Sequence, residues 1–149
     1  ANMCSVDGDM ARACYEAALE VDPDIIIMVL AATAMEDVVR DLGCNWAGEI
    51  FADRAYNDDA TLVDRSKPGA VIHDPAVAGP RILQMVQEGA IITESGKRIP
   101  TSIDTICLHG DTPTAVALAG SVRDSLTAGG IEIAQFAGRR ASDCGLCRK

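Results

Sequence analysis

The chain has 149 residues, of which 48% are hydrophobic, 23% charged and 3% aromatic, and its formal net charge is -9. A chain of this length can bury a core without disulfides or metal, so the composition predicts one soluble globular domain and excludes disordered and fibrous classes. The excess of carboxylates would repel nucleic-acid phosphates and anionic lipid, so we expect neither nucleic acid nor membrane as a partner.

A first helix is predicted over about residues 9–21, where small and apolar residues recur at helical spacing. Pro23 ends it. The side chains expected on its buried face are Met10, Ala13, Cys14, Ala17, Ala18 and Val21.

The next segment predicts a strand followed by a helix. Residues 24–32 form a β-branched apolar run, which is typical of a strand buried on both faces of a parallel sheet. Thr33 and Glu36 have capping-box spacing and Gly43 is a stop signal, so we expect a helix over about 34–42.

The middle of the chain predicts a short strand, a long connection and a third helix. The strand covers residues 47–52, and the polar, turn-rich segment 55–69 is long enough to be a functional excursion. A helix is expected over 74–89, but Pro80 in its interior predicts a kink or a late start.

The last third predicts a hairpin and a further strand–helix–strand unit. Residues 90–93 and 97–100 flank a Glu-Ser-Gly turn. A buried strand at 103–108 leads into a helix that begins at Pro113, and a final strand is expected at 131–135. Strands alternating with helices predict an α/β fold with a parallel sheet or barrel.

The cysteines favour a reduced protein. Cys4, Cys14, Cys44 and Cys107 are isolated in the sequence, and we expect buried free thiols. Cys144 and Cys147 form a C-x-x-C in a polar carboxyl-terminal segment, which supplies only half of a zinc shell and for which we expect a flexible tail rather than a redox or zinc site. The longest apolar run is too short to span a bilayer and no signal peptide is visible, so a cytoplasmic location is expected.

Polar residues gather at the predicted end of the 47–52 strand. Glu49 and Phe51 should point to one face and Ile50 to the other, which places a carboxylate at a position expected to be apolar. In parallel α/β folds the carboxyl ends of strands carry reactive groups. A structural ion pair among Glu49, Asp53 and Arg54 is an equally good interpretation.

A second polar cluster follows the strand at 103–108. His109, a glycine and Asp111 make an acid/base or metal-ligand pair at the mouth of a helix. The alternative is that Asp111 or Thr112 caps the helix and that His109 is hydrogen-bonded in the loop. The other histidine, His73, is expected in a surface loop. Two histidines and scattered carboxylates do not complete a zinc shell, so no metal site is predicted.

Several motifs are absent from the sequence: G-x-x-x-x-G-K-[ST], G-x-G-x-x-G, G-x-S-x-G and H-E-x-x-H. A standard phosphate loop, a Rossmann fingerprint, a serine-hydrolase elbow and a zincin helix are therefore excluded. If ATP is used, another chain must carry most of its site.

Three segments resemble, in order and spacing, the carboxyl-terminal half of the LamB/YcsF family: EIFADRAY (49–56), LVDRSKPGAVI (62–72) and TICLHGDTP (105–113). The resemblance runs from residue 1 to about 133. It implies that residues 1–136 are the carboxyl-terminal portion of a (β/α) barrel of the glycoside hydrolase/deacetylase type, with the amino-terminal strands missing, and that 137–149 form a tail.

The resemblance also implies a function. Members of this kind hydrolyse 5-oxoproline (pyroglutamate) to glutamate at the expense of ATP, together with the B and C subunits of a 5-oxoprolinase. The catalytic residues expected on this basis are His109, Asp111 and Glu49. Substrate or phosphate binding is expected from Asp53, Arg54 and Arg65.

The family's amino-terminal motifs, which end in Lys-Pro-His-Gly, are not in this sequence. We therefore expect either a fragment that pairs with a separate amino-terminal piece or a chain that self-associates to cover an open sheet. The competing hypothesis is a non-catalytic binding or structural protein. An in-frame Lys-Pro-His-Gly directly upstream in the DNA would favour a piece of the enzyme.

Overall fold

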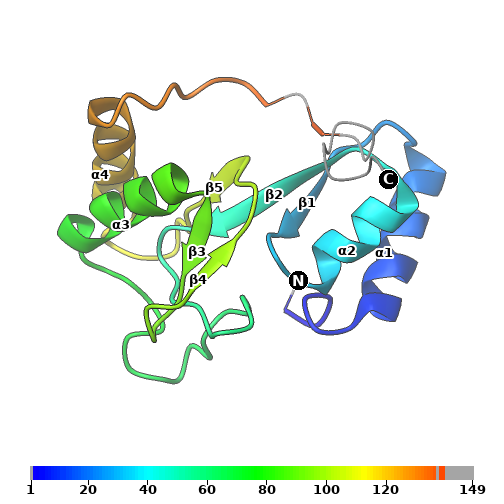
Figure 1. Ribbon diagram of the computed structural model, residues 1–149, viewed down its shortest axis with the longest axis horizontal. Helices are drawn as coiled ribbons and strands as arrows, with labels where there is room; N and C mark the ends of the chain where they lie inside the picture. The colour runs from blue at the N-terminus through cyan, green and yellow to red at the C-terminus, as the bar shows by residue number, and fades with distance from the viewer. Residues whose placement is uncertain (1, 137, 140–149) are drawn as a thin grey trace.

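The computed structural model describes residues 2–136, 138 and 139, and within these it contains four helices and two sheets (Figure 1). The helices are α1 Gly8–Val21, α2 Ala34–Leu42, α3 Pro75–Glu88 and α4 Ala115–Ala128. The larger sheet contains β1 Ile27–Leu30, β2 Trp46–Phe51 and β5 Thr105–Cys107. The smaller sheet contains β3 Ala90–Ile92 and β4 Arg98–Pro100.

The three-stranded sheet is parallel throughout, with the order β1-β2-β5. Glu49 in the central strand is in register with Leu30 on one side and Thr105 on the other. Helices connect the strands, as parallel pairing requires. The predicted parallel α/β arrangement is therefore confirmed.

The two faces of this sheet differ in burial. Ile27, Val29, Trp46 and Ile50 lie on one face and are buried in the main apolar cluster. Helix α1 packs on α2 beside β1, and α3 packs on α4 beside β5 (Figure 1). On the opposite face Leu30 and Ala47 are buried, whereas the side chains nearer its carboxyl end remain partly exposed: Glu49, Phe51, Thr105 and Cys107. No helix of the described chain has the length and apolar character needed to cross a bilayer.

Helix α1 forms where it was predicted but turns a different face inward. Asp7 caps its start by accepting a hydrogen bond from the Met10 amide, and Ala11 and Tyr15 are its buried residues. The predicted face is wrong, since Cys14 is exposed and Val21 is 87% exposed. Alanines lie on opposite sides of this helix, so their spacing does not define a buried face. The large side chain of Tyr15 decides which side packs against α2.

Helix α2 has the predicted limits but not the predicted capping box, because Glu36 bonds to the residue before the N-cap rather than to Thr33 itself. The Glu36 carboxylate accepts a hydrogen bond from the Ala32 amide at 2.7 Å. Thr33 caps no amide, because its hydroxyl donates instead to the Leu30 carbonyl. Gly43 ends the helix with a φ of 66°, a left-handed conformation that suits glycine.

Helix α3 starts at Pro75 and is assigned as helix through Pro80, so the expected late start is wrong. Asp74 fixes the start by accepting a hydrogen bond from the Ala76 amide at 2.9 Å. The Ser121 hydroxyl of α4 donates to the Pro75 carbonyl at 2.5 Å. Burial of this helix against α4 outweighs the single ladder bond that a proline removes.

The hairpin of β3 and β4 is confirmed, with Gly96 in its turn at a φ of 84°. Helix α4 begins at Ala115, two residues after the predicted Pro113, and Thr114 is its N-cap. Its buried residues Leu118 and Val122 join the main cluster.

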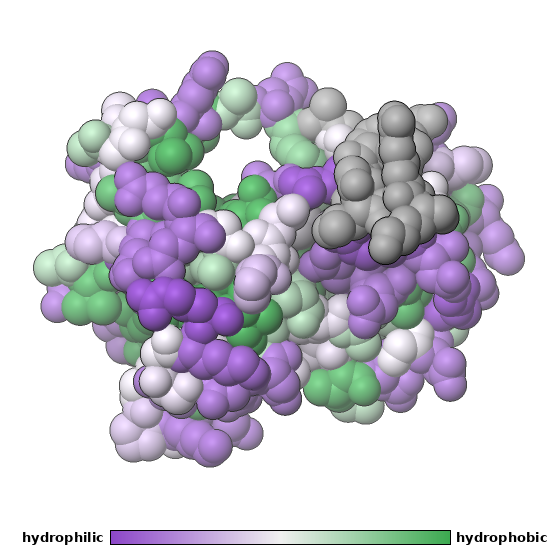
Figure 2. All heavy atoms as spheres, in the orientation of Figure 1, coloured by the Kyte–Doolittle hydropathy of each residue, from purple (hydrophilic) through white to green (hydrophobic). Residues whose placement is uncertain are grey.

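The strand expected at 131–135 is not formed. An apolar cavity of about 730 Å³ separates this segment from β5, and the opening beside it is visible in Figure 2. The chain returns to the sheet only at Arg139, whose backbone pairs with Trp46. The backbone pairing of Arg139 with Trp46 is too short to hold residues 131–135 in line with β5. The rest of the segment expected to be a tail, with Cys144 and Cys147, lies outside the described residues.

Candidate active site

Tyrosine and arginine side chains brace the chain where it leaves the carboxyl end of β2. The Phe51 amide donates to the Tyr56 hydroxyl at 2.7 Å. Arg81 of α3 reaches across to donate to the Phe51 carbonyl at 3.4 Å and to the Arg54 carbonyl at 3.0 Å, with its guanidinium over the Tyr56 ring. Burial lowers the pKa of Arg81 and raises that of Tyr56. Asp53 lies between the two anchored carbonyls, so its position is fixed.

Asp53 and His109 form the central contact of the site. Nδ1 of His109 lies 2.7 Å from Oδ2 of Asp53, which is 3% exposed. Because a carboxylate only accepts hydrogen bonds, this contact places the proton on Nδ1 and leaves Nε2 to exchange one. The imidazole also stacks on Phe51, with ring centroids 5.4 Å apart. The second oxygen of Asp53, Oδ1, has no hydrogen-bond partner among the described residues.

Glu49 shares the half-exposed face of β2 with Phe51. Burial raises the pKa of this carboxyl, while the electrostatic effect of nearby His109 opposes the rise. Cys107 is also close, since burial and then the charges of Glu49 and Asp53 raise its pKa to about 11. The face therefore holds a carboxyl group whose pKa is raised by burial and a thiol that stays neutral near pH 7.

Arg54 does not take part in the ion pair that the sequence allowed. Its guanidinium, on a residue that is 3% exposed, donates to the carbonyls of Ala70 at 3.3 Å and Val63 at 2.6 Å. No ion pair joins it to Glu49 or Asp53. The structural ion-pair interpretation is therefore wrong, because Asp53 turns to His109 and Arg54 turns to the excursion.

The excursion also brings Arg65 to Asp111. Their charged groups are 3.7 Å apart and both side chains are more than half exposed. Asp111 is thus paired with Arg65 and not with His109, and it does not cap α4, whose N-cap is Thr114. His73 is exposed, as predicted.

The roles of two supporting residues were missed by the sequence reasoning. Alternation along the strand placed Phe51 on the face of Glu49, as predicted, but no signal indicated that its ring stacks on His109. Arg81 carries no local signal, since it reaches the site from a helix that is distant in sequence. Among residues 2–136 and 138–139, no group of three histidine, cysteine or carboxylate side chains is arranged to hold a metal ion.

The fold and this geometry define a class: an α/β domain in which a buried carboxylate holds a partly exposed imidazole at the carboxyl ends of neighbouring parallel strands. The model of the LamB/YcsF family matches residues 1–141, further than the predicted limit near residue 133. The chain belongs to the LamB/YcsF family.

The chain is 72% identical over 136 residues to the A subunit of 5-oxoprolinase from Ruegeria pomeroyi, a match that covers 91% of this chain and 54% of that protein. It is 48% identical over 137 residues to the corresponding protein of Rhodopseudomonas palustris strain BisB18, covering 92% and 54%. The crystal structure of a lactam utilization protein from Thermus thermophilus superposes with a TM-score of 0.77 at 35% identity, covering 89% and 53%. The chain therefore spans about half the length of these relatives.

Proposed function

We propose that this chain supplies acid/base residues for the ATP-dependent hydrolysis of 5-oxoproline to glutamate, as part of the A subunit of a 5-oxoprolinase. The observation that carries the proposal is the buried Asp53–His109 hydrogen bond at the strand ends. The names of the relatives, which are 5-oxoprolinase A subunits and a lactam utilization protein, support the substrate class.

The chemistry explains the need for such groups. A lactam amide is stabilised by resonance, so ring opening requires activation of its carbonyl, for which phosphoryl transfer from ATP is a suitable route. Attack by water on the phosphorylated carbon then requires a base, and ring opening yields an acyl phosphate that a second water hydrolyses to the carboxylate and inorganic phosphate. The ring nitrogen must receive a proton as it leaves.

The residues fit these steps in the following way. His109, held at Nδ1 by Asp53, can take a proton from water at Nε2. Glu49 lies on the same face, and its raised pKa suits a carboxyl group that delivers a proton to the ring nitrogen. Asp111 is exposed and paired with Arg65, which favours Glu49 over Asp111 for this role.

The proposed reaction needs partners. The sequence lacks a standard phosphate loop, so we assign most of the ATP site to the B and C subunits. A reaction that consumes ATP fits a cytoplasmic location. We also propose that the three parallel strands belong to a (β/α) barrel, with Glu49 and Phe51 facing its interior, because these side chains are less buried than Ile50 on the opposite face.

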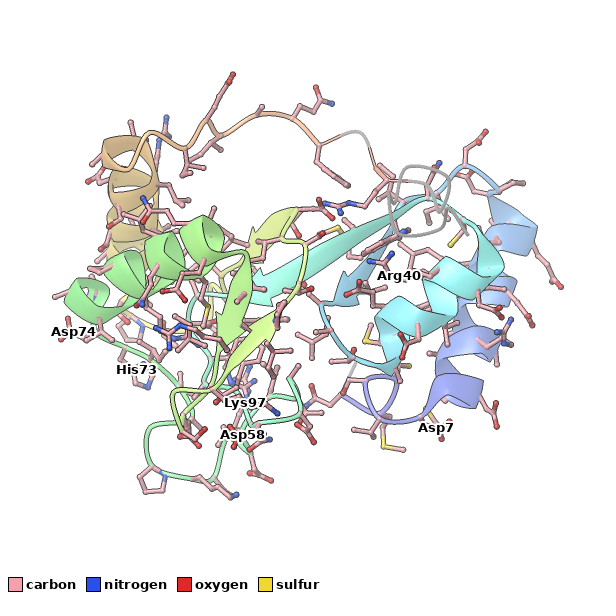
Figure 3. The ribbon with its side chains drawn as sticks, viewed as in Figure 1. Asp7, Arg40, Asp58, His73, Asp74 and Lys97 are labelled. Atoms are coloured by element: carbon pink, nitrogen blue, oxygen red, sulfur yellow. The ribbon has the colours of Figure 1, made fainter. Side chains whose placement is uncertain are left out.

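The test is 5-oxoproline-dependent ATP hydrolysis by the B and C subunits, with this chain added alone and then together with the amino-terminal segment of a family relative. His109→Gln should lower the rate about 10²–10⁴-fold, the range for general acid–base groups. His73→Gln is the matched control, because His73 is exposed, lies by Asp74 at the start of α3 (Figure 3) and takes no part in the Asp53–His109 hydrogen bond, so it should leave the rate unchanged. Full activity of His109→Gln, or no stimulation by the wild-type chain in either mixture, would favour the non-catalytic alternative.

A further inference from the structure

A second cavity, of about 460 Å³, lies between the amino-terminal turn and the excursion that follows β2. Both segments are on the same side of the molecule in Figure 1. Three cationic residues line this cavity, Arg54, Arg65 and Lys67, against one carboxylate, Asp64. Such an excess of positive charge is unexpected in a chain with a net charge of -9.

Arg54 is the buried member of this group, and no carboxylate of the described chain forms an ion pair with it. It is 3% exposed, and within the described chain its guanidinium contacts only carbonyl oxygens by hydrogen bonds and makes no ion pair. Burial and then the like charge of Arg65 lower its pKa. A guanidinium has five N–H groups, so two hydrogen bonds leave three to bind something else. The charges of Asp53 and Asp64 partly compensate Arg54 without forming an ion pair with it, so the arrangement still favours an anionic ligand in contact with the guanidinium.

The neighbouring carboxylates are already engaged. Asp64 accepts hydrogen bonds from the amide and hydroxyl of Ser66 at 2.8 and 2.7 Å. Asp53 holds His109, and Asp111 is paired with the outer part of Arg65. Lys67 makes no side-chain hydrogen bond or ion pair with the described residues. The cavity therefore retains cationic donors that no residue of the described chain satisfies.

The cavity also adjoins the candidate active site. Arg54 directly follows Asp53 in the chain, and the Arg65–Asp111 pair connects the excursion to the loop that begins with His109. We propose that Arg54, Arg65 and Lys67 form an oxyanion subsite that holds a carboxylate or phosphoryl group of the ligand while its reacting bond faces Asp53 and His109. Only the identity of that ligand rests on the function proposed above.

Binding to the isolated full chain tests the subsite without any turnover. Inorganic phosphate and 5-oxoproline are titrated separately by calorimetry at constant ionic strength, with 2-pyrrolidinone as the lactam that lacks a carboxylate. The wild-type chain should bind at least one of the two anions, and 2-pyrrolidinone should not displace it. The double variant Arg65→Gln, Lys67→Gln should weaken binding at least about tenfold, as expected for the loss of hydrogen bonds to charged groups.

Lys97→Gln is the matched control, because Lys97 is exposed and donates to the Asp58 carbonyl outside the cavity (Figure 3). It removes one positive charge and should leave the affinity unchanged. Arg54→Lys keeps the positive charge but loses the forked N–H donors of the guanidinium. If this variant melts at the wild-type temperature, it should bind the anion more weakly than the wild type. If Arg54→Lys unfolds the chain, the double variant at exposed positions still decides the question.

The two sources of the oxyanion give different results. Competition between 5-oxoproline and phosphate assigns the subsite to the substrate carboxylate, whereas phosphate binding that 5-oxoproline does not disturb assigns it to a phosphoryl group. Either result supports the subsite, even if the reconstituted complex proves inactive and the proposed function fails. Equal binding by the wild type and the double variant, or no binding of either anion, overturns the subsite and leaves the His109 test untouched.

Discussion

Two buried aspartates of the parallel sheet lie in contrasting surroundings. Asp104 lies just before β5. Its Oδ2 accepts a hydrogen bond from the Gly48 amide at 2.9 Å, and its Oδ1 forms an ion pair with Arg139. Asp53, just after β2, binds His109 through Oδ2, and its Oδ1 has no partner in the described chain. Their side chains are 7% and 5% exposed, so burial does not distinguish them.

The difference lies in what each carboxylate leaves available. Asp104 has both oxygens satisfied by groups that do not titrate near pH 7, which is what a structural contact requires. Asp53 holds a group that can exchange a proton and keeps one acceptor free. A buried carboxylate is therefore informative about function when its partners are incomplete, and the following predictions test that contrast.

The largest effect is expected from Asp53→Asn. The amide cannot hold the imidazole in the same protonation state, so activity in the reconstituted complex should fall about 10²–10⁴-fold. Stability should change by no more than about 1 kcal/mol, because the amide is of the same size and still forms a hydrogen bond with His109 in place of the carboxylate. Steady-state rates and urea unfolding measure the two quantities on the same preparation. A large loss of stability with normal activity per folded molecule would place Asp53 in the same category as Asp104.

Asp104→Asn should show the opposite pattern. It leaves the half-buried Arg139 without its counter-charge and replaces one carboxylate oxygen by a donor, so the free energy of unfolding should fall by about 2 kcal/mol. Activity per folded molecule should remain that of the wild type. Urea unfolding followed by far-UV circular dichroism measures the loss, and an unchanged midpoint would contradict it.

The sequence alone did not predict the different surroundings of Asp53 and Asp104. The helices and strands up to β5 follow from local signals such as Gly43, Gly96 and the β-branched runs. The three motifs predicted that Asp53 and His109 belong to the site, but the sequence suggested Asp111, close by in the chain, as the partner of His109. The structure pairs His109 with Asp53 and Asp111 with Arg65. Residues 56 positions apart meet only because β2 and β5 are adjacent, and sheet order is a tertiary property.

The failures have a common physical cause. The face of α1 and the missing strand at 131–135 both depend on a packing partner rather than on local propensity. The side of α1 that carries Tyr15 packs against α2, whereas the described segment after α4 forms no backbone hydrogen bonds with β5. Periodicity describes what a segment is able to bury, but only the fold decides against what it is buried.

A smaller effect is expected from Glu49→Gln, seen as a pH dependence of stability. The raised pKa in the folded state means that folding favours the protonated carboxyl, so the wild type loses stability as pH rises from the ordinary pKa through the raised one. Glutamine has no such loss. The melting temperature of the variant should therefore exceed that of the wild type at pH 8 and converge with it near pH 4. Parallel melting curves across this range would show that burial of Glu49 carries no such cost.

The smallest effect concerns the chemical reactivity of the thiols rather than the reaction rate of the enzyme or the stability of the fold. A pKa of about 11 leaves roughly one part in a thousand of Cys107 as thiolate at pH 8, so iodoacetamide should modify it much more slowly than the exposed Cys14. Peptide mass spectrometry over a time course compares the two sites. Lowering the charge of the neighbouring carboxylate through Glu49→Gln should accelerate the modification of Cys107 and leave that of Cys14 unchanged. Equal rates at both cysteines would contradict the assigned environment.

The single tryptophan of the chain gives the other end of the sheet an optical readout. Trp46 is fully buried, with the guanidinium carbons of Arg40 and Arg139 at 4.7 and 5.5 Å from its ring centroid. Arg40 belongs to α2, whereas Arg139 arrives after the long segment that follows α4. Detachment of that segment removes one of two cations from the indole and admits water beside it, while the helices stay folded. Intrinsic fluorescence therefore reports whether the carboxyl-terminal segment is docked, independently of global unfolding followed by circular dichroism.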